Sequence, residues 1–536
     1  MSATAPQSSH AAASATKAGR PKGDHDGPAP SRRASASVTP KAYDMPHWRG
    51  LALAAALPMA LLYLATASGY GGWLDSGTFI AAAVHLGIAH PPGHALAQLL
   101  HYPFTLLPCG PLAWRVAVAS SVYAAIALGL TAVLLDRSLA CFVGDVSPGA
   151  RPATRAPAGR AQQAARHARW WRHALVLTAV WLLGLSPAWW LQAVRPEVYA
   201  AQIMLITLAL ERLTLTLTLR AQQSPRALAA LLQAGFCWAL GLSNHHFISI
   251  TVLLPGLWLA LQFARSHGAR IWAWLAWATT TALWPLAYLP LRAGARGAFH
   301  LGRLNLGAPD DLSRFLWVVS AQAFQKNTGQ GVPGELGERG ESLLAVLHAH
   351  LHLGLLFTAL AGAYLLLRQR HSRAFGILWL SLAIPVVLAR AWLGFVRGNP
   401  DALGYLLPAS LALALATLVL LVAPTVLWPR RRRLCLALAT LAALAWLPAQ
   451  AQRGWLQAAR HRFTDTDTLS VFSLRALPAR SVLVLHDPQS IFALFGQQAE
   501  SGVRPDIEVV PVPLLPYPGL LGELLARSPE LAAFLR

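Results

Sequence analysis

Long runs of apolar residues alternate with short polar segments along most of the chain. Helices of roughly 17–25 apolar residues can cross a lipid bilayer, and about eleven runs of this kind are present, two of them short. They cover about residues 49–67, 113–135, 173–191, 198–218, 228–243, 245–263, 271–291, 344–367, 374–392, 403–427 and 434–449. The pattern predicts an all-α polytopic membrane protein with about eleven transmembrane helices.

The composition supports this interpretation. Of the 536 residues, 55% are hydrophobic and 12% are charged, whereas soluble domains carry about 25% charged residues. A formal net charge of +22 could indicate a nucleic-acid partner, but the basic residues stand in alternate loops rather than in one patch. Such spacing is typical of the cytoplasmic loops of a membrane protein, so we expect no nucleic-acid partner.

The positions of Lys and Arg also predict how the chain is oriented. Basic residues are frequent before the first span and in the loop after the second, whereas the segment 68–93 contains no Lys or Arg. We therefore expect a cytoplasmic N-terminus, with outward loops at 68–112, 192–197, 292–343 and 393–402. With an odd number of spans, the C-terminal tail also lies outside. The expected location is a bacterial inner membrane.

Three regions follow from this division. Residues 1–47 are rich in Ala, Ser, Pro and basic residues, lack the apolar core of a signal peptide, and are expected to be disordered on the cytoplasmic side. Residues 48–450 form the transmembrane domain with its outward loops. Residues 451–536 form a small extracytoplasmic α/β domain.

The α/β character of the tail rests on two apolar strands, at 481–486 and 506–512, on either side of a helix at 489–500. Strands joined by a helix should pair in parallel. Asp487 ends the first strand, a position where such sheets tend to bind ligands. The tail has no G-x-G-x-x-G segment, so we expect no nucleotide site.

Asp75 is the only formal charge in the segment 68–93. Ionisable groups in or beside a membrane are costly and usually functional. Asp75 and Ser76 precede an apolar helix predicted at about 77–89, whose N-terminus either side chain can cap. Two interpretations stay open: Asp75 caps this helix, or it is a catalytic carboxylate at the membrane surface. His90 stands in the rigid, Pro-containing turn that ends the helix.

Three further outward positions are candidates for binding. Glu197 follows Arg195 by two residues, and these side chains either bind substrate or pair with each other. His245 and His246 could bind a metal, but adjacent residues point in different directions, so hydrogen bonding is the better interpretation and no metal site is expected. Arg292, at the outer end of a span, could bind a phosphate with its planar fork of donors or extend toward the lipid interface.

Several short segments, in order across much of the chain, resemble one family of multispan membrane proteins, which includes a transmembrane protein O-mannosyltransferase. The matching segments are Asp75-Ser76-Gly77, Leu86 to Gly93 (LGIAHPPG), Ser186-Pro187, Glu197 to Ala200 (EVYA), Asn244-His245, Tyr288-Leu289-Pro290 with Arg292, and Gly502 to Asp506 (GVRPD). The first two segments are specific, and the others gain weight as a series.

The resemblance implies a GT-C glycosyltransferase fold, a polyprenyl-phosphate sugar as donor, and a catalytic acidic residue in the first outward loop. Asp75 matches that catalytic position, and the matched candidates for binding donor or substrate are His90, Glu197, His245 and Arg292. The implied activity transfers a sugar, mannose-like, to a protein or glycan hydroxyl outside the membrane. A single carboxylate acting as general base is consistent with inversion. The expected partners are the lipid-linked donor, the acceptor and membrane lipids.

The chain departs from the family pattern at three places. Thr78 stands where the family usually has an acidic residue, Leu306 stands where it usually has Trp, and the segment 487–490 lacks the usual Gly-Asp. Without a carboxylate at Thr78 we expect no two-carboxylate metal site, although a divalent metal stays open as a cofactor. Two other functions also stay open. One is a transporter or flippase of a lipid-linked solute, which predicts charges inside the spans, and the other is a non-catalytic envelope assembly protein.

Overall fold

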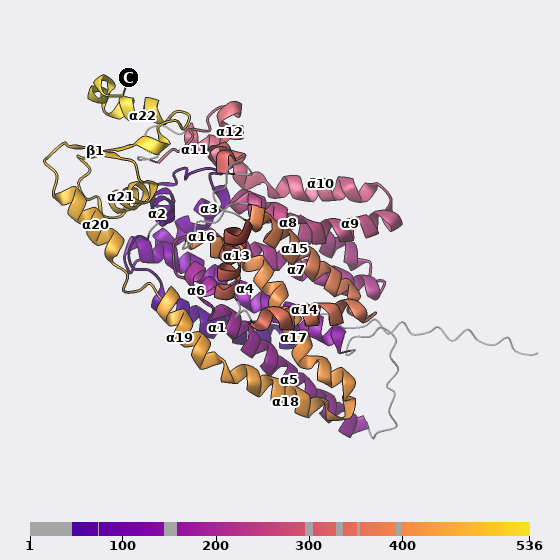
Figure 1. The fold of residues 1–536 in the computed structure, drawn as a ribbon. Coiled ribbons are helices and arrows are strands. Elements are labelled where there is room, and N and C mark those ends of the chain that lie inside the picture. Colours follow the sequence, from indigo (N-terminus) through magenta and orange to yellow (C-terminus); the bar gives the residue numbers. More distant parts are fainter. Residues whose placement is uncertain are drawn as a thin grey trace, which may run out of the picture. The chain divides into compact units, whose positions relative to one another are not determined.

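The computed structural model describes residues 46–72, 74–143, 158–294, 304–327, 336–350, 354–392 and 399–535. The chain divides into two units, Met1–Met45 and Pro46–Arg536. The first unit, and with it most of the segment predicted to be disordered, lies outside the described residues. The described part of the second unit is mostly helical (Figure 1).

The helices of the first half follow the order of the apolar runs. Long helices form where the chain has enough apolar residues to cross a bilayer, and short ones lie in the segments between them. Their bounds are α1 (Pro46–Thr66), α2 (Ser76–His85), α3 (Ala95–Thr105), α4 (Leu112–Phe142), α5 (Ala158–Gly184), α6 (Pro187–Ala193), α7 (Tyr199–Ala221), α8 (Arg226–Thr251), α9 (Leu253–His267), α10 (Arg270–Ala282), the 3₁₀ helix η1 (Trp284–Ala287) and α11 (Tyr288–Ala293).

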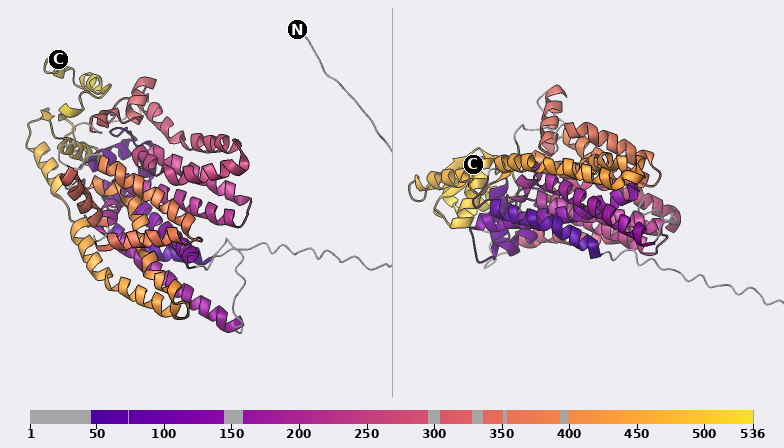
Figure 2. Two further views of the ribbon diagram at one scale, coloured as in Figure 1. Left: turned by 45° about the vertical axis from the view of Figure 1, so that its right-hand side comes forward. Right: turned by 90° about the horizontal axis from the view of Figure 1, so that it is seen from below.

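The second half of the bundle packs against the first. Helix α17 lies against α14, and α18 runs beside α5, as the views in Figure 2 also show. The bounds here are α12 (Leu312–Val319), η3 (Gln322–Asn327), α13 (Leu336–His350), α14 (Gly354–Arg368), α15 (Arg373–Trp392), α16 (Asp401–Tyr405), α17 (Leu407–Leu427), η4 (Pro429–Arg431), α18 (Arg432–Ala445) and α19 (Leu447–Ala458).

The predicted number of eleven spans is not confirmed. Among the described residues, seven helices have the length and composition of a membrane span, or eight if α5 and α6, which meet at 70°, form one broken span. Several expected spans are divided between helices, of which three serve as examples. The run at 245–263 begins inside α8 and continues in α9, the run at 271–291 is split among α10, η1 and α11, and the run at 344–367 is split between α13 and α14. Pro285, at the start of η1, lacks the N–H that a continuous helix requires.

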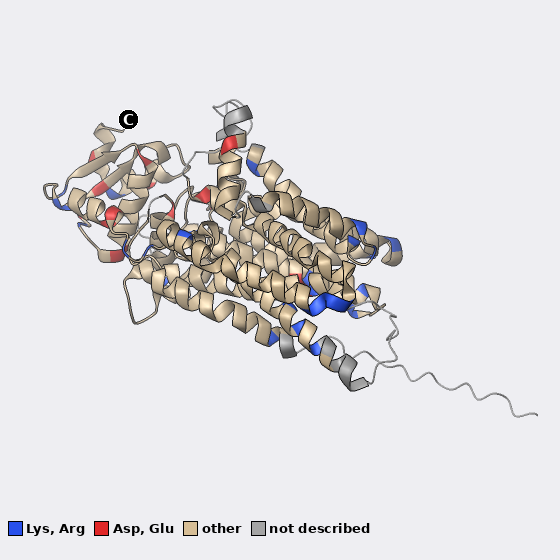
Figure 3. Ribbon diagram, turned by 60° about the horizontal axis from the view of Figure 1, so that its bottom comes forward, with Lys and Arg blue, Asp and Glu red and all other residues tan. Residues whose placement is uncertain are grey.

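Long stretches of the helix bundle carry no charged residue. Figure 3 shows long stretches of ribbon without Lys, Arg, Asp or Glu; basic residues gather toward the end away from the tail, and most acidic residues lie near or on the tail. Side faces without charge fit helices surrounded by lipid. The protein is therefore an integral, multi-pass membrane protein, while the cytoplasmic location of its N-terminus stays a prediction.

The tail contains the predicted strand–helix–strand unit, and its two strands pair in parallel. Leu474, Leu494 and Ile507 form a small buried cluster that joins the unit to the helix before it. The tail's extracytoplasmic location stays a prediction. The bounds are α20 (Asp465–Arg475), β1 (Val482–Leu485), α21 (Pro488–Ser501), β2 (Glu508–Pro511), η5 (Val512–Leu514), α22 (Leu520–Arg527) and η6 (Pro529–Ala533).

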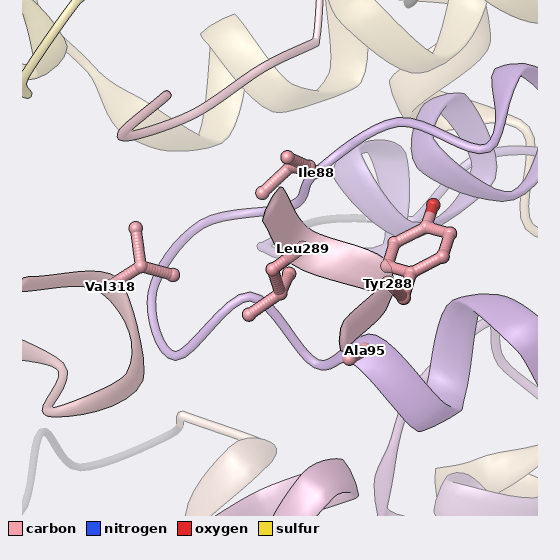
Figure 4. Close-up of a cluster of buried hydrophobic side chains, with 5 residues drawn as sticks. All are labelled: Ile88, Ala95, Tyr288, Leu289 and Val318. Atoms are coloured by element: carbon pink, nitrogen blue, oxygen red, sulfur yellow. The ribbon is translucent and has the colours of Figure 1, made fainter. Parts of the chain in front are cut away.

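A buried apolar cluster joins the turn after α2 to segments far along the chain (Figure 4). The backbone of the turn also pairs with one of those segments: the Ile88 N–H donates to the carbonyl of Leu304, and the Leu306 N–H donates to the carbonyl of Ile88, both at 3.1 Å. Leu306, where the family usually has Trp, is fully buried. The members of the cluster are Ile88, Ala95, Tyr288, Leu289 and Val318.

Candidate active site

Asp75 occupies the N-cap position of α2, where its carbonyl accepts the Phe79 N–H at 3.1 Å, but its side chain does not cap the helix. Its side chain makes no hydrogen bond to the first turn, so the interpretation of Asp75 as a helix cap is wrong. The carboxylate instead faces His90, with 3.5 Å between Asp75 Oδ2 and His90 Nε2, and 30% of the side chain is exposed. The Thr78 hydroxyl donates to the carbonyl of Asp75 at 2.7 Å. This contact holds the backbone of Asp75 and leaves its carboxylate accessible.

His90 is buried within a ring of aromatic side chains. Its Nδ1 lies 3.4 Å from the Thr78 hydroxyl, so Thr78 contacts both members of the Asp75–His90 pair. The ring centroid of His90 is 5.4 Å from that of Phe79, 6.2 Å from that of Phe324 and 5.8 Å from that of Phe492. These three rings come from α2, η3 and α21, so three distant parts of the chain surround one imidazole.

The turn that carries His90 is held by the segment Tyr288-Leu289-Pro290 and Arg292. Helix α2 ends at His85, earlier than the predicted residue 89, because Leu86 adopts a left-handed conformation. The Tyr288 hydroxyl donates to the carbonyl of Gly87 at 2.7 Å. Arg292 donates to the carbonyls of Leu86, at 2.8 Å, and His85, at 3.0 Å.

Gly93 ends this turn with a positive φ of 83°, a conformation that favours glycine. A Cβ atom at Gly93 would lie 2.9 Å from Leu289 and 3.0 Å from Val318. The turn can therefore pack against the cluster of Figure 4 only with glycine here. Two of the segments that carry the family resemblance, Leu86–Gly93 and Tyr288–Pro290 with Arg292, are thus neighbours in space. The role of Arg292 in binding a donor phosphate stays a prediction.

A second set of charges lies at the N-terminal end of α7. Arg195 forms an ion pair with Asp401, and its Nη1 lies 3.5 Å from Glu197 Oε1, so the predicted Arg195–Glu197 pair is present. Gln192 also accepts hydrogen bonds from the guanidinium, at 3.0 and 3.2 Å. Sequence reasoning missed Asp401. The available signal was that it is the one acidic residue of the predicted outward loop 393–402.

The two sets of charges influence each other. Burial raises the pKa of the Asp75 carboxyl, His90 lowers it in part, and Asp401 raises it further. Burial likewise raises the pKa of Glu197 well above its ordinary value; Arg195 lowers it, while Asp401 and Asp75 raise it. Glu197 and Asp401 meet at the Arg195 guanidinium and form one polar region, whereas the Asp75 carboxylate faces His90.

The sequence predicted a break between two spans at residues 243–245, and the chain does leave helical geometry there, although as a kink rather than as an outward turn. His245 lies inside α8, where non-helical backbone angles (φ −148°, ψ 89°) mark the kink. Its ring packs 5.7 Å from that of Tyr199, 5.1 Å from that of Tyr405 and 5.6 Å from that of His94. His94 Nδ1 donates to the carbonyl of Asn244 at 2.7 Å. The kink thus connects the aromatic ring around His90 with the charges around Arg195.

This arrangement can accept a proton from a hydroxyl group. A partly exposed carboxylate with a raised pKa is a stronger base than an ordinary one, and the neighbouring imidazole can hold it in place. Within the described ranges, no group of three or more His, Cys, Asp or Glu side chains is arranged to hold a metal ion.

Three comparisons with known proteins bear on this site. Residues 75–269 match the model of a family described as the protein O-mannosyl-transferase TMEM260 N-terminal domain. The chain is 25% identical over 225 residues to protein O-mannosyl-transferase TMEM260 of Mus musculus, an alignment that covers 40% of this chain and 27% of the mouse protein. The crystal structure of ArnT from Cupriavidus metallidurans bound to undecaprenyl phosphate superposes with a TM-score of 0.51 at 11% identity, covering 87% of this chain and 89% of ArnT.

The matched family segment begins at Asp75 and includes His90, Glu197 and His245. The likeness to ArnT extends over most of the described helices and shows the fold alone, and the chain spans about a quarter of the length of the mouse relative. The chain is therefore similar to the TMEM260 protein O-mannosyl-transferase family over residues 75–269, within an ArnT-like GT-C fold that extends over most of its length.

Proposed function

We propose that this protein is a membrane glycosyltransferase. It transfers a sugar, mannose-like, from a polyprenyl-phosphate donor to a hydroxyl of a protein or glycan at the outer face of the membrane, with inversion at the anomeric carbon. The resemblance to a protein O-mannosyl-transferase supports the reaction class. An ArnT structure bound to undecaprenyl phosphate supports a lipid-phosphate donor for this fold.

The observation that carries the proposal is the partly exposed Asp75 carboxylate facing the buried His90. In the proposed step, the acceptor oxygen attacks the anomeric carbon while Asp75 takes the hydroxyl proton. The bond between the anomeric carbon and the phosphate oxygen breaks, and its electron pair leaves with the polyprenyl phosphate. Glu197 and Asp401 are engaged by Arg195, which leaves Asp75 as the base and favours a single displacement.

Arg292 is our proposed contact for the leaving phosphate. Its bonds to the carbonyls of His85 and Leu86 fix the guanidinium at the end of α2, next to the turn that carries His90. The positive charge remains after those bonds form, and it would stabilise the phosphate dianion as the donor bond breaks. Arg292→Gln should then raise the apparent KM for the donor.

The substitution Asp75→Asn tests the proposed function. Purified protein in lipid is supplied with a polyprenyl-phosphate sugar and an acceptor with a free hydroxyl, and transfer is measured by mass spectrometry. Loss of a general base lowers rates by about 10²–10⁴-fold. Because Asp75 makes no capping bond, the variant should keep the thermal stability of the wild type.

Asp467→Asn is the matched control. Asp467 also contacts the first outward loop, where it accepts a hydrogen bond from the Gly71 N–H at 2.8 Å, and Asn keeps an acceptor at that place. This control should transfer at the wild-type rate. Near wild-type transfer by the Asp75→Asn protein would exclude Asp75 as the base.

A further inference from the structure

The C-terminal tail lies against the candidate active site at a point of backbone contact. Helix α21 crosses α2 where two glycines meet: a Cβ atom at Gly77 would overlap the carbonyl of Phe492, and a Cβ atom at Gly496 would lie 2.9 Å from the Cα of Gly77. Gly77 belongs to the Asp75-Ser76-Gly77 segment. Because Gly77 has no side chain, the backbone of α21 contacts α2 at a residue that is only two positions after Asp75, the proposed base.

This close approach brings Phe492 onto the imidazole of His90. The two rings are stacked, with centroids 5.8 Å apart and planes inclined by 23°, and both side chains are buried, at 6% and 5% exposure. The polar contacts of His90, to Asp75 at 3.5 Å and to Thr78 at 3.4 Å, are long for hydrogen bonds. Packing by aromatic faces therefore does more than hydrogen bonding to set the orientation of this ring.

The tail is anchored to the outward loops on both sides of this contact. On one side the Thr466 hydroxyl donates to the carbonyl of Gly71 at 3.0 Å. On the other side the Asn305 amide donates to Glu523 at 2.6 Å, and Trp317 packs edge-on against Tyr517 at 5.1 Å. Anchors at both ends of the tail hold α21 in register on α2.

We propose that the tail is part of the catalytic unit and that Phe492 is a positioning residue for the Asp75–His90 pair. By stacking on His90, Phe492 keeps Nε2 directed at the Asp75 carboxylate, and so keeps that carboxylate directed at the acceptor. The inference rests on the proposed function for its catalytic consequence. The positioning of His90 itself does not depend on it.

The test compares Phe492→Ala with Leu494→Ala. Leu494 is on the same helix and equally buried, at 3% exposure, but it packs into the tail's own cluster with Leu474 and Ile507. A general loss of tail stability should therefore affect both variants alike. Phe492→Tyr keeps a flat ring on His90 and serves as the rescue variant.

Two readouts are needed. The first is the rate at which diethyl pyrocarbonate modifies His90, followed by mass spectrometry of the full-length protein in lipid. The second is transfer from a polyprenyl-phosphate sugar, with kcat and donor KM measured separately. In Phe492→Ala, His90 should react several-fold faster, and kcat should fall by about tenfold or more with little change in KM, because a small misplacement of a reacting group costs up to about a hundredfold. Phe492→Tyr should restore both values, and Leu494→Ala should leave both near wild type.

Equal His90 reactivity in the Phe492→Ala and Leu494→Ala proteins would overturn the inference. The labelling readout does not use the transfer reaction, so it decides the inference even if the wild-type protein shows no transfer. In that case the proposed function fails and the positioning of His90 by Phe492 is judged separately. If His90 reacts faster in Phe492→Ala but kcat is unchanged, the stacking has no part in catalysis. That outcome would also overturn the proposal.

Discussion

Two buried sets of charges lie near opposite ends of α4, and their geometries differ. Near its C-terminal end, Asp136 pairs with Arg172 at 2.7 Å, and Arg137 pairs with Glu211 at 3.0 Å. Near its N-terminal end, the Ser120 hydroxyl donates to the carbonyl of Glu197 at 3.3 Å, next to the charges around Arg195. The first set joins α4 to α5 and α7, and the second lies among the loops predicted to face outward.

The difference between the two sets indicates a difference in role. In the first set, short ion pairs meet inside the bundle, and Trp48 adds a hydrogen bond to Asp136 at 3.1 Å. In the second set, Asp75 is partly exposed and 3.5 Å from His90, and burial raises its pKa. Short, buried ion pairs hold helices together, whereas a reachable carboxylate with a raised pKa suits proton transfer. Charges within a helix bundle therefore do not by themselves indicate a transport path.

The largest expected effect comes from breaking the first set. Asp136→Ala leaves Arg172 buried without its carboxylate, and loss of one partner of a buried ion pair costs about 3–5 kcal/mol. We expect a large drop in the thermal unfolding temperature in detergent, while the fraction that stays folded keeps its transfer rate per molecule.

Asp310→Ala is the control for this prediction. Asp310 pairs with Arg314 at 2.9 Å, but both side chains are exposed, and surface pairs contribute about 0–1 kcal/mol. If Asp136→Ala abolished transfer in a protein that still unfolds at the wild-type temperature, the first set of charges would have a catalytic role and the assigned difference between the two sets would be wrong.

The sequence predicted those parts of this site that local patterns specify. Asp75 stands out because it is the one formal charge of its loop, and the tail's strands and helix follow from short apolar runs between turn residues. Asp401 and Phe492 come from segments far from Asp75 in the chain. Asp401 could have been noticed as the one acidic residue of its loop, but only the folded packing shows that it pairs with Arg195 and that Phe492 stacks on His90.

The sequence located the kink at His245 but not its form. The two apolar runs divide between residues 243 and 245, and the backbone leaves helical geometry at His245, yet the chain makes a kink there rather than an outward turn. The helix-cap interpretation of Asp75 failed because of packing between distant segments. An aspartate before a helix is a common cap, and the competing contact with His90 depends on a turn that is held by Tyr288 and Arg292.

Glu197→Gln tests the second set of charges through the pH dependence of stability. Burial raises the pKa of Glu197 in the folded protein well above its ordinary value of 4.5, so the folded state holds this proton more tightly than the unfolded state. The contribution of Glu197 to stability is therefore greatest below the unfolded pKa and is lost as the pH rises through the folded pKa.

Gln cannot ionise, so the variant should gain stability relative to wild type as the pH rises above 4.5, by about 1.4 kcal/mol for each unit between the two pKa values. Thermal unfolding of both proteins across a pH series gives this difference directly. If the stability gained by Glu197→Gln instead shrank with rising pH, Arg195 would keep Glu197 ionised in the folded protein. The environment of Glu197 would then resemble that of the ion pairs in the first set.

His90→Gln should move the acid limb of the pH–rate profile. His90 lowers the pKa of Asp75, which burial and Asp401 otherwise raise. Without the imidazole, Asp75 should hold its proton to a higher pH, so the fall of kcat/KM on the acid side should begin at a higher pH than in wild type. His85→Gln, which changes the exposed histidine at the end of α2, should leave the limb in place. If the acid limb does not move in the His90→Gln protein, His90 does not lower the pKa of Asp75.

The smallest effect is expected at Asp487, the carboxylate of the tail that the sequence placed at a position where ligands tend to bind. Its carboxylate accepts hydrogen bonds from the backbone N–H and the hydroxyl of Ser490, both at 2.8 Å, and so caps α21. Asp487→Ala should cost about 1 kcal/mol of stability, whereas Asn caps almost as well as Asp and should cost a few tenths. Neither change should alter kcat, since α21 reaches the site through Phe492, more than a turn from its cap. If the Asp487→Asn protein lost transfer at full stability, the base would lie in the tail. Asp75 would then have a structural role, as Asp136 has in the first set of charges.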